Sequence, residues 1–432
     1  MSVKETLNRD GNSPLAPCWT YFDDEDCGDG VPRLSSDCSS HVLYGCAIGH
    51  GGDRGSLVYG VGETVNVPFS FGCPLALKIY PISITENELA FIRALFASDL
   101  TAFNNKGGSC GVCRQVPYLV LPLAIVTIGG VDRGILMPRH DYSLKQFLLA
   151  TGPAVEVVGH GERGEDGADE KRFAASSLLS HRVFEPIRDC KVVTAIAFQL
   201  VVAISLLGEE LPHVKDGILC RGFTHNDIHL DNILLNSESG CAALCDFELV
   251  GHISQDGEEI PPPALHRLPP YCRQSPHGLF SPTADTWALG LVVLSLLTGV
   301  DPLFDDAKLM DDFGDGPLLQ SYTESEGTVP VPDWEGNIKA HVEALLLRDD
   351  PTGQRLADAG PLLELCAKCL VNRAGASPSV AVELLSQPLF SSHINSPQEA
   401  EFILKVWAES HRGAPPLKAA RDGTESPESQ PL

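Results

Sequence analysis

The segment HNDIHLDN at residues 225–232 combines residue types whose spacing could support proton and metal chemistry. Asp227 can accept a proton from an attacking hydroxyl, and Asn232, on the same short loop, can hold a metal ion from the same side. The apolar run 241–245 predicts a strand that ends at Asp246, whose carboxylate could be a second metal ligand. These residues predict a site where a hydroxyl group is deprotonated beside a metal ion.

Two features upstream could bind phosphate. Lys78 closes a strand-like run, and a lysine there can meet phosphate oxygens as a point charge. The segment 48–59 is rich in glycine, which lets backbone N–H groups approach a phosphate chain. Two registers of this loop stay open: one uses Gly49, Gly51 and Gly55, and the other aligns backwards from Gly55 through Gly52 and His50.

The secondary structure predicted around these residues changes from β-rich to helical along the chain. Short β-rich runs alternate with glycine-rich turns from residue 42 to 138, with one helical stretch at 85–97. Apolar helices are predicted at 191–207 and 284–298, and Ser396 to Glu399 forms a capping box that opens a last helix. A β-rich part followed by a larger helical part predicts the α+β class.

The order of motifs resembles the protein kinase superfamily. A glycine-rich loop, A-x-K, H-x-D-x-x-x-x-N, D-F-x and the D-x-W-x-L-G of residues 285–290 follow one another at plausible spacings. The resemblance implies a two-lobed kinase-like fold. We expect a flexible extension at 1–39, a β-rich N-lobe at 40–138, a helical C-lobe at 139–395 with a polar insertion at about 151–175, a C-terminal helix at 396–412 and a disordered tail at 413–432.

The resemblance also implies ATP and Mg²⁺ as cofactors and a role for each site residue. Asp227 would be the catalytic base, and Asp285 would anchor its loop. His229 stands where serine/threonine kinases carry a lysine, and its imidazole could still donate to a phosphate. Asn232 and Asp246 would hold Mg²⁺. The nucleotide would contact Gly49, Gly51, Gly55, Ala76, Lys78, Glu88 and Met137.

The partner of Lys78 is expected on the helix at 85–97. Glu88 precedes apolar residues at i+3, i+4 and i+7, as expected of a helix that faces the core. Thr85 and Glu88 also form a capping box, so Glu88 could serve only as a cap, and Glu86 is the competing partner.

Several positions depart from the kinase pattern. Asn226 replaces the arginine that would meet a phosphorylated activation segment, and Glu248 replaces the glycine of D-F-G. Glu248 could hold metal or a water molecule, or simply point to solvent. The segments 271–276 and 372–378 lack the usual buried Glu–Arg pair.

Three functions therefore remain: an active protein kinase, a pseudokinase that binds a nucleotide or a protein with little turnover, and a small-molecule phosphotransferase similar to choline or aminoglycoside kinases. The combination of Leu136-Met137-Pro138, the divergent segment 271–276 and the irregular glycine loop also resembles the rhoptry-type kinases of apicomplexan parasites.

Composition limits the partners. The 432 residues carry a net charge of −26, which excludes general attraction to nucleic acid and makes a basic protein the more compatible substrate. No membrane span is expected, because the apolar runs are too short: the run 192–206 is uncharged but is below the usual length. Cys110 and Cys113 have CxxC spacing, but a closed zinc site needs four ligands, so no zinc site is predicted there. No signal peptide is visible and no cellular location is predicted, although the rhoptry-type resemblance would imply a secreted organelle.

Overall fold

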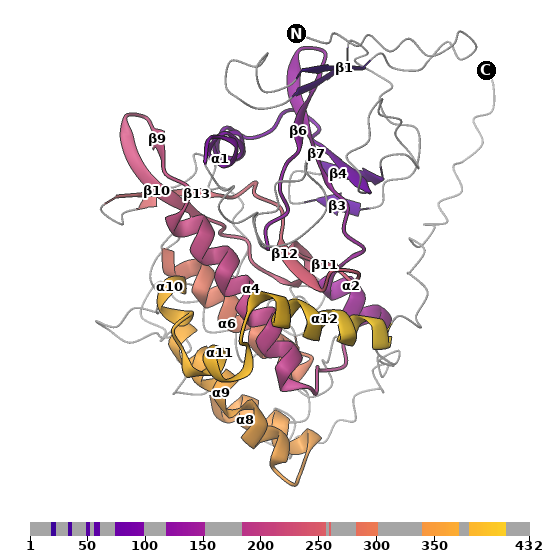
Figure 1. Ribbon diagram of the computed structural model, residues 1–432, viewed down its shortest axis with the longest axis vertical. Coiled ribbons are helices and arrows are strands. Elements are labelled where there is room, and N and C mark those ends of the chain that lie inside the picture. The colour runs from indigo at the N-terminus through magenta and orange to yellow at the C-terminus, as the bar shows by residue number, and fades with distance from the viewer. Residues whose placement is uncertain are drawn as a thin grey trace, which may run out of the picture.

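The computed structural model describes residues 19–22, 33–36, 49–51, 56–60, 74–98, 118–151, 184–255, 259–260, 282–300, 339–370 and 380–411. A large sheet and helix α1 (Glu86–Ala97) lie at one end of the molecule, and most other helices lie at the other end (Figure 1). This mixture of helix and sheet agrees with the predicted α+β class, while the division into two lobes and its boundaries stay predictions.

The large sheet has seven strands, and most neighbours are antiparallel. Its order is β1 (Trp19–Phe22), β2 (Arg33–Ser36), β6 (Ala124–Ile128), β7 (Val131–Pro138), β5 (Leu75–Ile79), β4 (Ser56–Gly60) and β3 (Gly49–Gly51). Every residue of β5 is buried, because the strand pairs with β4 and β7 in the sheet interior. Within the expected flexible extension 1–39, the structure thus has two strands, and β2 pairs in parallel with β6.

Helix α1 begins where the sequence predicts. The Thr85 side chain accepts a hydrogen bond from the Glu88 backbone N–H at 3.1 Å, which caps the first turn. Phe91 and Ile92 are fully buried, whereas Glu86 is exposed. The helix therefore turns Glu88, not Glu86, towards the interior.

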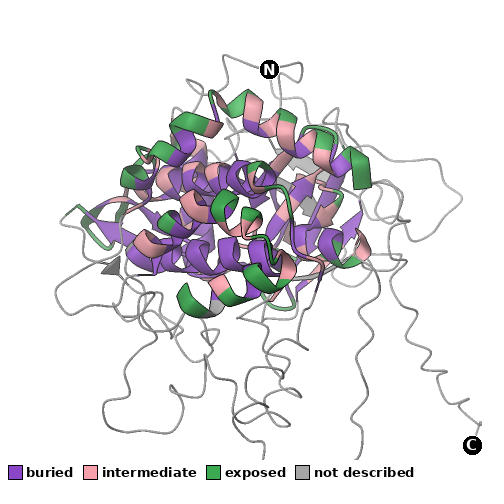
Figure 2. Ribbon diagram, turned by 90° about the horizontal axis from the view of Figure 1, so that it is seen from below, coloured by how far each residue is buried: buried purple, intermediate pink, exposed green. Residues whose placement is uncertain are grey.

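The helical part is built around α4 (Cys190–Glu209), which begins at an Asp189 cap. By length and composition α4 could cross a membrane, yet 72% of its most apolar window is buried inside the protein. Burial on most sides is what a core helix requires, and Figure 2 shows the buried helices beneath outer helices with exposed faces. The other α-helices among the described residues are α2 (Leu144–Thr151), α6 (Pro282–Thr298), α8 (Lys339–Asp349), α9 (Gln354–Cys369), α10 (Ala381–Leu384), α11 (Pro388–His393) and α12 (Pro397–His411).

Two smaller sheets lie beside α4. One has the order β14 (Glu259–Ile260), β13 (Gly251–Ser254), β10 (Ile218–Thr224) and β9 (His213–Lys215), and the other has β12 (Cys241–Leu244), β11 (Ile233–Asn236) and β8 (Tyr142–Ser143). The segment 225–232, which includes the short 3₁₀ helix Leu230–Asn232, connects β10 to β11. The predicted loop thus lies between two sheets.

The C-terminal helix α12 packs on α4, and its capping box is only half formed. The Ser396 hydroxyl accepts from the Glu399 backbone N–H at 3.2 Å, but the Glu399 carboxylate accepts from Asn395 instead of Ser396. Residues 152–175 of the predicted polar insertion and the tail at 413–432 lie outside the described residues.

Candidate active site

The loop 225–232 is fixed from below by Asp285 at the start of α6. Its carboxylate accepts hydrogen bonds from the backbone N–H groups of His225, at 2.7 Å, and Asn226, at 2.8 Å. Asp285 is only 2% exposed, and burial raises the pKa of its carboxyl group. Asn226 has a φ of 63°, a left-handed conformation that these two bonds help to hold. The anchoring role predicted for Asp285 is therefore visible in these contacts.

The loop brings Asp227 and Asn232 into direct contact. The Asn232 Nδ2 donates to the Asp227 carboxylate oxygen Oδ2 at 2.7 Å and to its backbone oxygen at 2.9 Å. The other carboxylate oxygen, Oδ1, is buried and has no hydrogen-bond partner among the described residues. An oxygen held in place but left without a donor can accept a proton from an incoming hydroxyl.

His229 lies beside this carboxylate, with Nε2 at 3.6 Å from Asp227 Oδ1. Burial acts to lower the pKa of the imidazole, but Asp227 and Asp231 outweigh it, so the net pKa is raised. His229 therefore carries more positive charge near neutral pH than an isolated histidine would. That charge suits a position near a transferred phosphate.

Lys78 joins the sheet to the segment after β12. Its Nζ lies 2.6 Å from Asp246 Oδ1 and 2.8 Å from Glu248 Oε1. Burial acts to lower the lysine pKa, but the carboxylates outweigh it and hold the pKa well above its usual range. For Asp246, burial acts to raise the pKa and Lys78 outweighs it, so the net pKa is lowered. Lys78 and Asp246 are thus both charged at neutral pH.

The sequence left open whether Glu248 binds metal or water or points to solvent. It is 6% exposed and accepts from the Ser56 hydroxyl of β4 at 3.3 Å, so it does not point to solvent. Its bonds to Lys78 and Ser56 tie the segment after Asp246 to the large sheet. A carboxylate in place of glycine, two residues from another carboxylate, was the only sequence signal of this role.

The expected ion pair between Lys78 and Glu88 is not the arrangement found. The Glu88 carboxylate accepts from the Tyr80 hydroxyl at 2.9 and 2.8 Å, while Lys78 lies against Asp246 and Glu248. Burial raises the pKa of Glu88 to about 7, although the nearby Lys78 charge opposes this shift. The cause is local: Tyr80 ends the same strand run as Lys78 and reaches Glu88 with a hydroxyl. Sequence reasoning gave Tyr80 no role.

Phe247 connects the site to α1. Its ring lies 4.3 Å from the Phe91 ring and 5.1 Å from the His225 ring, measured between centroids. A further contact joins Phe91 to Phe223 of β10 at 5.4 Å. This packing fixes the positions of the residues on either side of Phe247.

The expected nucleotide side is only partly within the described residues. Gly49 and Gly51 lie in β3, opposite Val58 and Ser56 of β4, while Gly55 lies outside the described residues. Ala76 and Met137 are direct partners on β5 and β7 and so lie at the same level of the sheet. Ala76 is buried, and Met137 is half-buried.

The residues present fit a Mg²⁺ ion. The Asn232 amide nitrogen is used by Asp227, which leaves the amide oxygen, the atom that coordinates Mg²⁺, on the opposite side of the group. Asp246 has a φ of 65°, an unusual conformation for a residue other than glycine, as is found at functional sites. Two oxygen ligands plus phosphate oxygens are the usual set for this ion.

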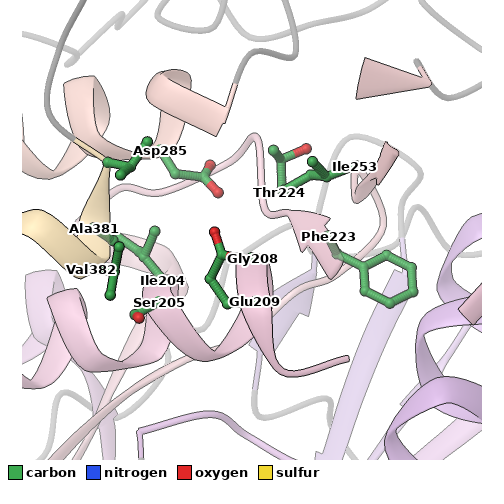
Figure 3. Close-up of a pocket in the computed structure, with 11 residues that line it drawn as sticks. Ile204, Ser205, Gly208, Glu209, Phe223, Thr224, Ile253, Asp285, Ala381 and Val382 are labelled. Atoms are coloured by element: carbon green, nitrogen blue, oxygen red, sulfur yellow. The ribbon is translucent and has the colours of Figure 1, made fainter. Parts of the chain in front are cut away.

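A separate pocket lies among α4, α6, α10 and β10 (Figure 3). Asp285 and Thr224 line it, together with apolar residues such as Ile204 and Ile253. Lys78 and Asp246 are not among its lining residues. The pocket is therefore separate from the place where Lys78, Asp246 and Glu248 meet.

Comparisons with known proteins give distant relatives. No family model matches the chain. The chain is 29% identical over 196 residues to serine/threonine-protein kinase SBK2 of Rattus norvegicus, which covers 39% of this chain and 51% of the rat protein. It is 24% identical over 262 residues to the same kinase of Mus musculus, covering 57% of this chain and 69% of the mouse protein. It is 24% identical over 249 residues to mitogen-activated protein kinase kinase kinase 6 of Homo sapiens, covering 56% of this chain and 18% of the human protein.

The chain thus spans about half the length of the rat kinase that it matches. The rat and mouse relatives are serine/threonine-protein kinases and the human relative is a protein kinase kinase kinase, and together they support the protein kinase superfamily as the origin of the motifs. The rhoptry-type resemblance has no support among them and stays a prediction.

Proposed function

We propose that the chain is an ATP-dependent protein kinase that phosphorylates serine or threonine hydroxyls, with Mg²⁺ as cofactor. One observation carries the proposal: Asn232 holds Asp227 at 2.7 Å on a loop that is anchored by Asp285, beside Asp246 bound to Lys78 at 2.6 Å. A base, two oxygen ligands and a phosphate-binding cation are the parts that phosphoryl transfer needs. The distant relatives favour the same reaction class.

Each residue then has a task. Asp227 Oδ1 accepts the proton of the substrate hydroxyl. Asn232 holds the Asp227 carboxylate in place, and His229 supplies positive charge beside it. Lys78 shares its donors between Asp246 and the phosphates. Asn232 and Asp246 would hold Mg²⁺, which neutralises phosphate charge when bound. The net charge of −26 favours a basic protein substrate.

A second candidate is a pseudokinase that binds nucleotide or a protein with little turnover. Lys78 already has two carboxylate partners, and one of them, Glu248, stands where kinases carry glycine. If a nucleotide cannot draw Lys78 away from these carboxylates, binding and chemistry both suffer. Nucleotide binding without turnover would favour this candidate.

The test is a phosphotransfer assay with Mg·ATP on basic serine, threonine and tyrosine peptides. Asp227→Asn should lower turnover by at least about 100-fold, because it removes the base. Glu238→Gln is the control, since Glu238 is an exposed carboxylate on the turn between β11 and β12. Equal rates for the parent and Asp227→Asn would overturn the kinase proposal, and small alcohols as better substrates would favour a small-molecule phosphotransferase.

A further inference from the structure

Three residues that can bind metal meet on the small sheet beside α1, apart from the candidate active site. His213 lies on β9, Cys220 on β10 and His252 on β13, and one potential ligand atom from each lies within 4.8 Å of the others. His213 and Cys220 are direct cross-strand partners, so their side chains share one face of the sheet. Three neighbouring strands thus supply one ligand each (Figure 1).

The orientation of His213 is that of a metal ligand. Its Nδ1 lies 2.9 Å from the Leu211 backbone oxygen, so Nδ1 carries the proton and donates to that oxygen. Nε2 then has a lone pair that faces the cluster. Metal-binding histidines are commonly held in this way by a hydrogen bond from the other ring nitrogen.

His252 is a buried imidazole with unused bonding capacity. It is 1% exposed, its Nδ1 lies 2.7 Å from His213 Nε2, and its Nε2 has no hydrogen-bond partner among the described residues. Burial, followed by the neighbouring His213, lowers the pKa of His252 to about 4, and burial also lowers the pKa of His213. Both rings are therefore neutral at pH 7, which is the form that binds metal.

We propose that His213, Cys220 and His252 bind one zinc-class divalent ion. Zinc takes nitrogen at about 2.0–2.1 Å and thiolate sulfur at about 2.3 Å in a tetrahedron, and three protein ligands leave its fourth position open to water or a small ligand. Ligand atoms in such a tetrahedron lie roughly 3.3–3.6 Å apart. In the absence of metal, His252 Nδ1 donates its proton to His213 Nε2 at 2.7 Å. On binding, that proton would move to His252 Nε2, which has no other partner among the described residues, and the two facing nitrogens would separate slightly around the ion.

The cysteine makes binding depend on a proton. Cys220 is fully buried, and burial raises the pKa of its thiol, which donates to the Ile218 backbone oxygen at 3.7 Å. Binding replaces the S–H bond with a sulfur–metal bond and releases that proton to solvent.

The site would also fix the sheet that supports α1. The His213 ring stacks on Phe223 at 4.1 Å with an angle of 6° between the planes, and Phe223 contacts Phe91 of α1 at 5.4 Å. A bound ion would hold β9, β10 and β13 together beneath this contact. Loading the site should therefore raise the melting temperature of the full chain.

The experiment titrates the chelator-treated full chain with Co²⁺ as a spectroscopic probe and then with Zn²⁺. We expect one equivalent of tetrahedral Co²⁺ with a thiolate charge-transfer band, displacement by Zn²⁺, and release of about one proton at pH 7. Cys220→Ser should abolish the band and weaken binding at least about 100-fold, and His213→Asn should weaken binding similarly. Cys190→Ser is the matched control, since Cys190 is a free cysteine on α4 outside the cluster, and it should bind as the parent does.

Either of two results would overturn the proposal. A parent protein that takes up neither metal would leave an ordinary hydrogen-bonded histidine pair. Metal uptake that survives Cys220→Ser and His213→Asn, or that occurs without proton release, would place the ion elsewhere. The absence of uptake by the parent overturns the proposal without any variant, and circular dichroism of Cys220→Ser and His213→Asn shows whether each variant is folded.

Discussion

The loop 225–232 and the segment 246–248 both hold buried carboxylates, but they are held in different ways. The loop is fixed by Asp285, whose oxygens bond to two backbone N–H groups. The segment is fixed by Lys78, a side chain that can change partners. A backbone anchor serves the fold alone, whereas a side-chain cation can serve the fold in one state and a phosphate in another.

This difference separates residues needed for folding from those needed for chemistry. Loss of the backbone anchor should appear as lost stability, whether or not a ligand is present. Loss of Lys78 should lower both stability and nucleotide affinity, whereas its replacement by another cation should restore stability but not nucleotide affinity. The expected effects decrease in the order Asp285, Lys78, Glu88 and, last, removal of any bound phosphate.

The largest effect is expected for Asp285→Ala. It leaves the backbone N–H groups of His225 and Asn226 buried without acceptors, at roughly 2 kcal/mol each. Chemical denaturation should therefore show a loss of about 4 kcal/mol in the free energy of unfolding. A variant that unfolds at the parental midpoint would show that the loop does not depend on this anchor.

Lys78→Met should cost about 3 kcal/mol of stability, because it leaves Asp246 and Glu248 buried without their cation. Lys78→Arg keeps the charge, so it should restore most of the stability. It should not restore nucleotide affinity, since a planar guanidinium cannot replace a compact ammonium at the phosphates. Melting curves and Mg·ATP titrations on the same samples test both points, and parental nucleotide affinity in Lys78→Met would contradict the proposed contact.

Glu88→Gln should change how stability depends on pH. The pKa of Glu88 is about 7 in the folded chain and 4.5 ordinarily, so the parent loses stability from this group as pH rises through that window. The variant lacks the titration, and its stability relative to the parent should rise by about 2 kcal/mol between about pH 5 and pH 7. Glu86→Gln, an exposed neighbour on α1, is the control and should follow the parent. Parallel curves for the parent and Glu88→Gln would contradict the raised pKa.

The sequence predicted the parts of the site that local patterns determine. The cap at Thr85 fixes which face of α1 is inward, and the 225–232 spacing brings Asn232 to Asp227. The ion-pair partner of Lys78 was harder to predict, because the sequence allows this lysine to pair with Glu88 or with Asp246. Only the three-dimensional positions of Tyr80 and Ser56 decide it.

Long-range pairing also limited prediction. Strand β1 and strand β2 lie in a polar stretch with little alternation, yet β2 pairs with β6 about 90 positions later along the chain. His213 and His252 are far apart in sequence, and only the register of β9, β10 and β13 brings them to one face. No local pattern encodes such a register.

The smallest effect is expected for removal of phosphate groups, and the reason lies in Asn226. Its Nδ2 donates to Thr224 Oγ1 at 2.9 Å and to the Leu249 backbone oxygen at 3.0 Å, so a neutral amide already connects the loop to the segment after Asp246. An amide offers no charged fork to a phosphate, so an added phosphate gains little here. Phosphatase treatment should leave turnover, or nucleotide affinity if turnover is absent, within about threefold, less than about 1 kcal/mol. Mass spectrometry confirms phosphate removal, a mock-treated sample is the control, and a hundredfold loss would show that another group binds an activating phosphate.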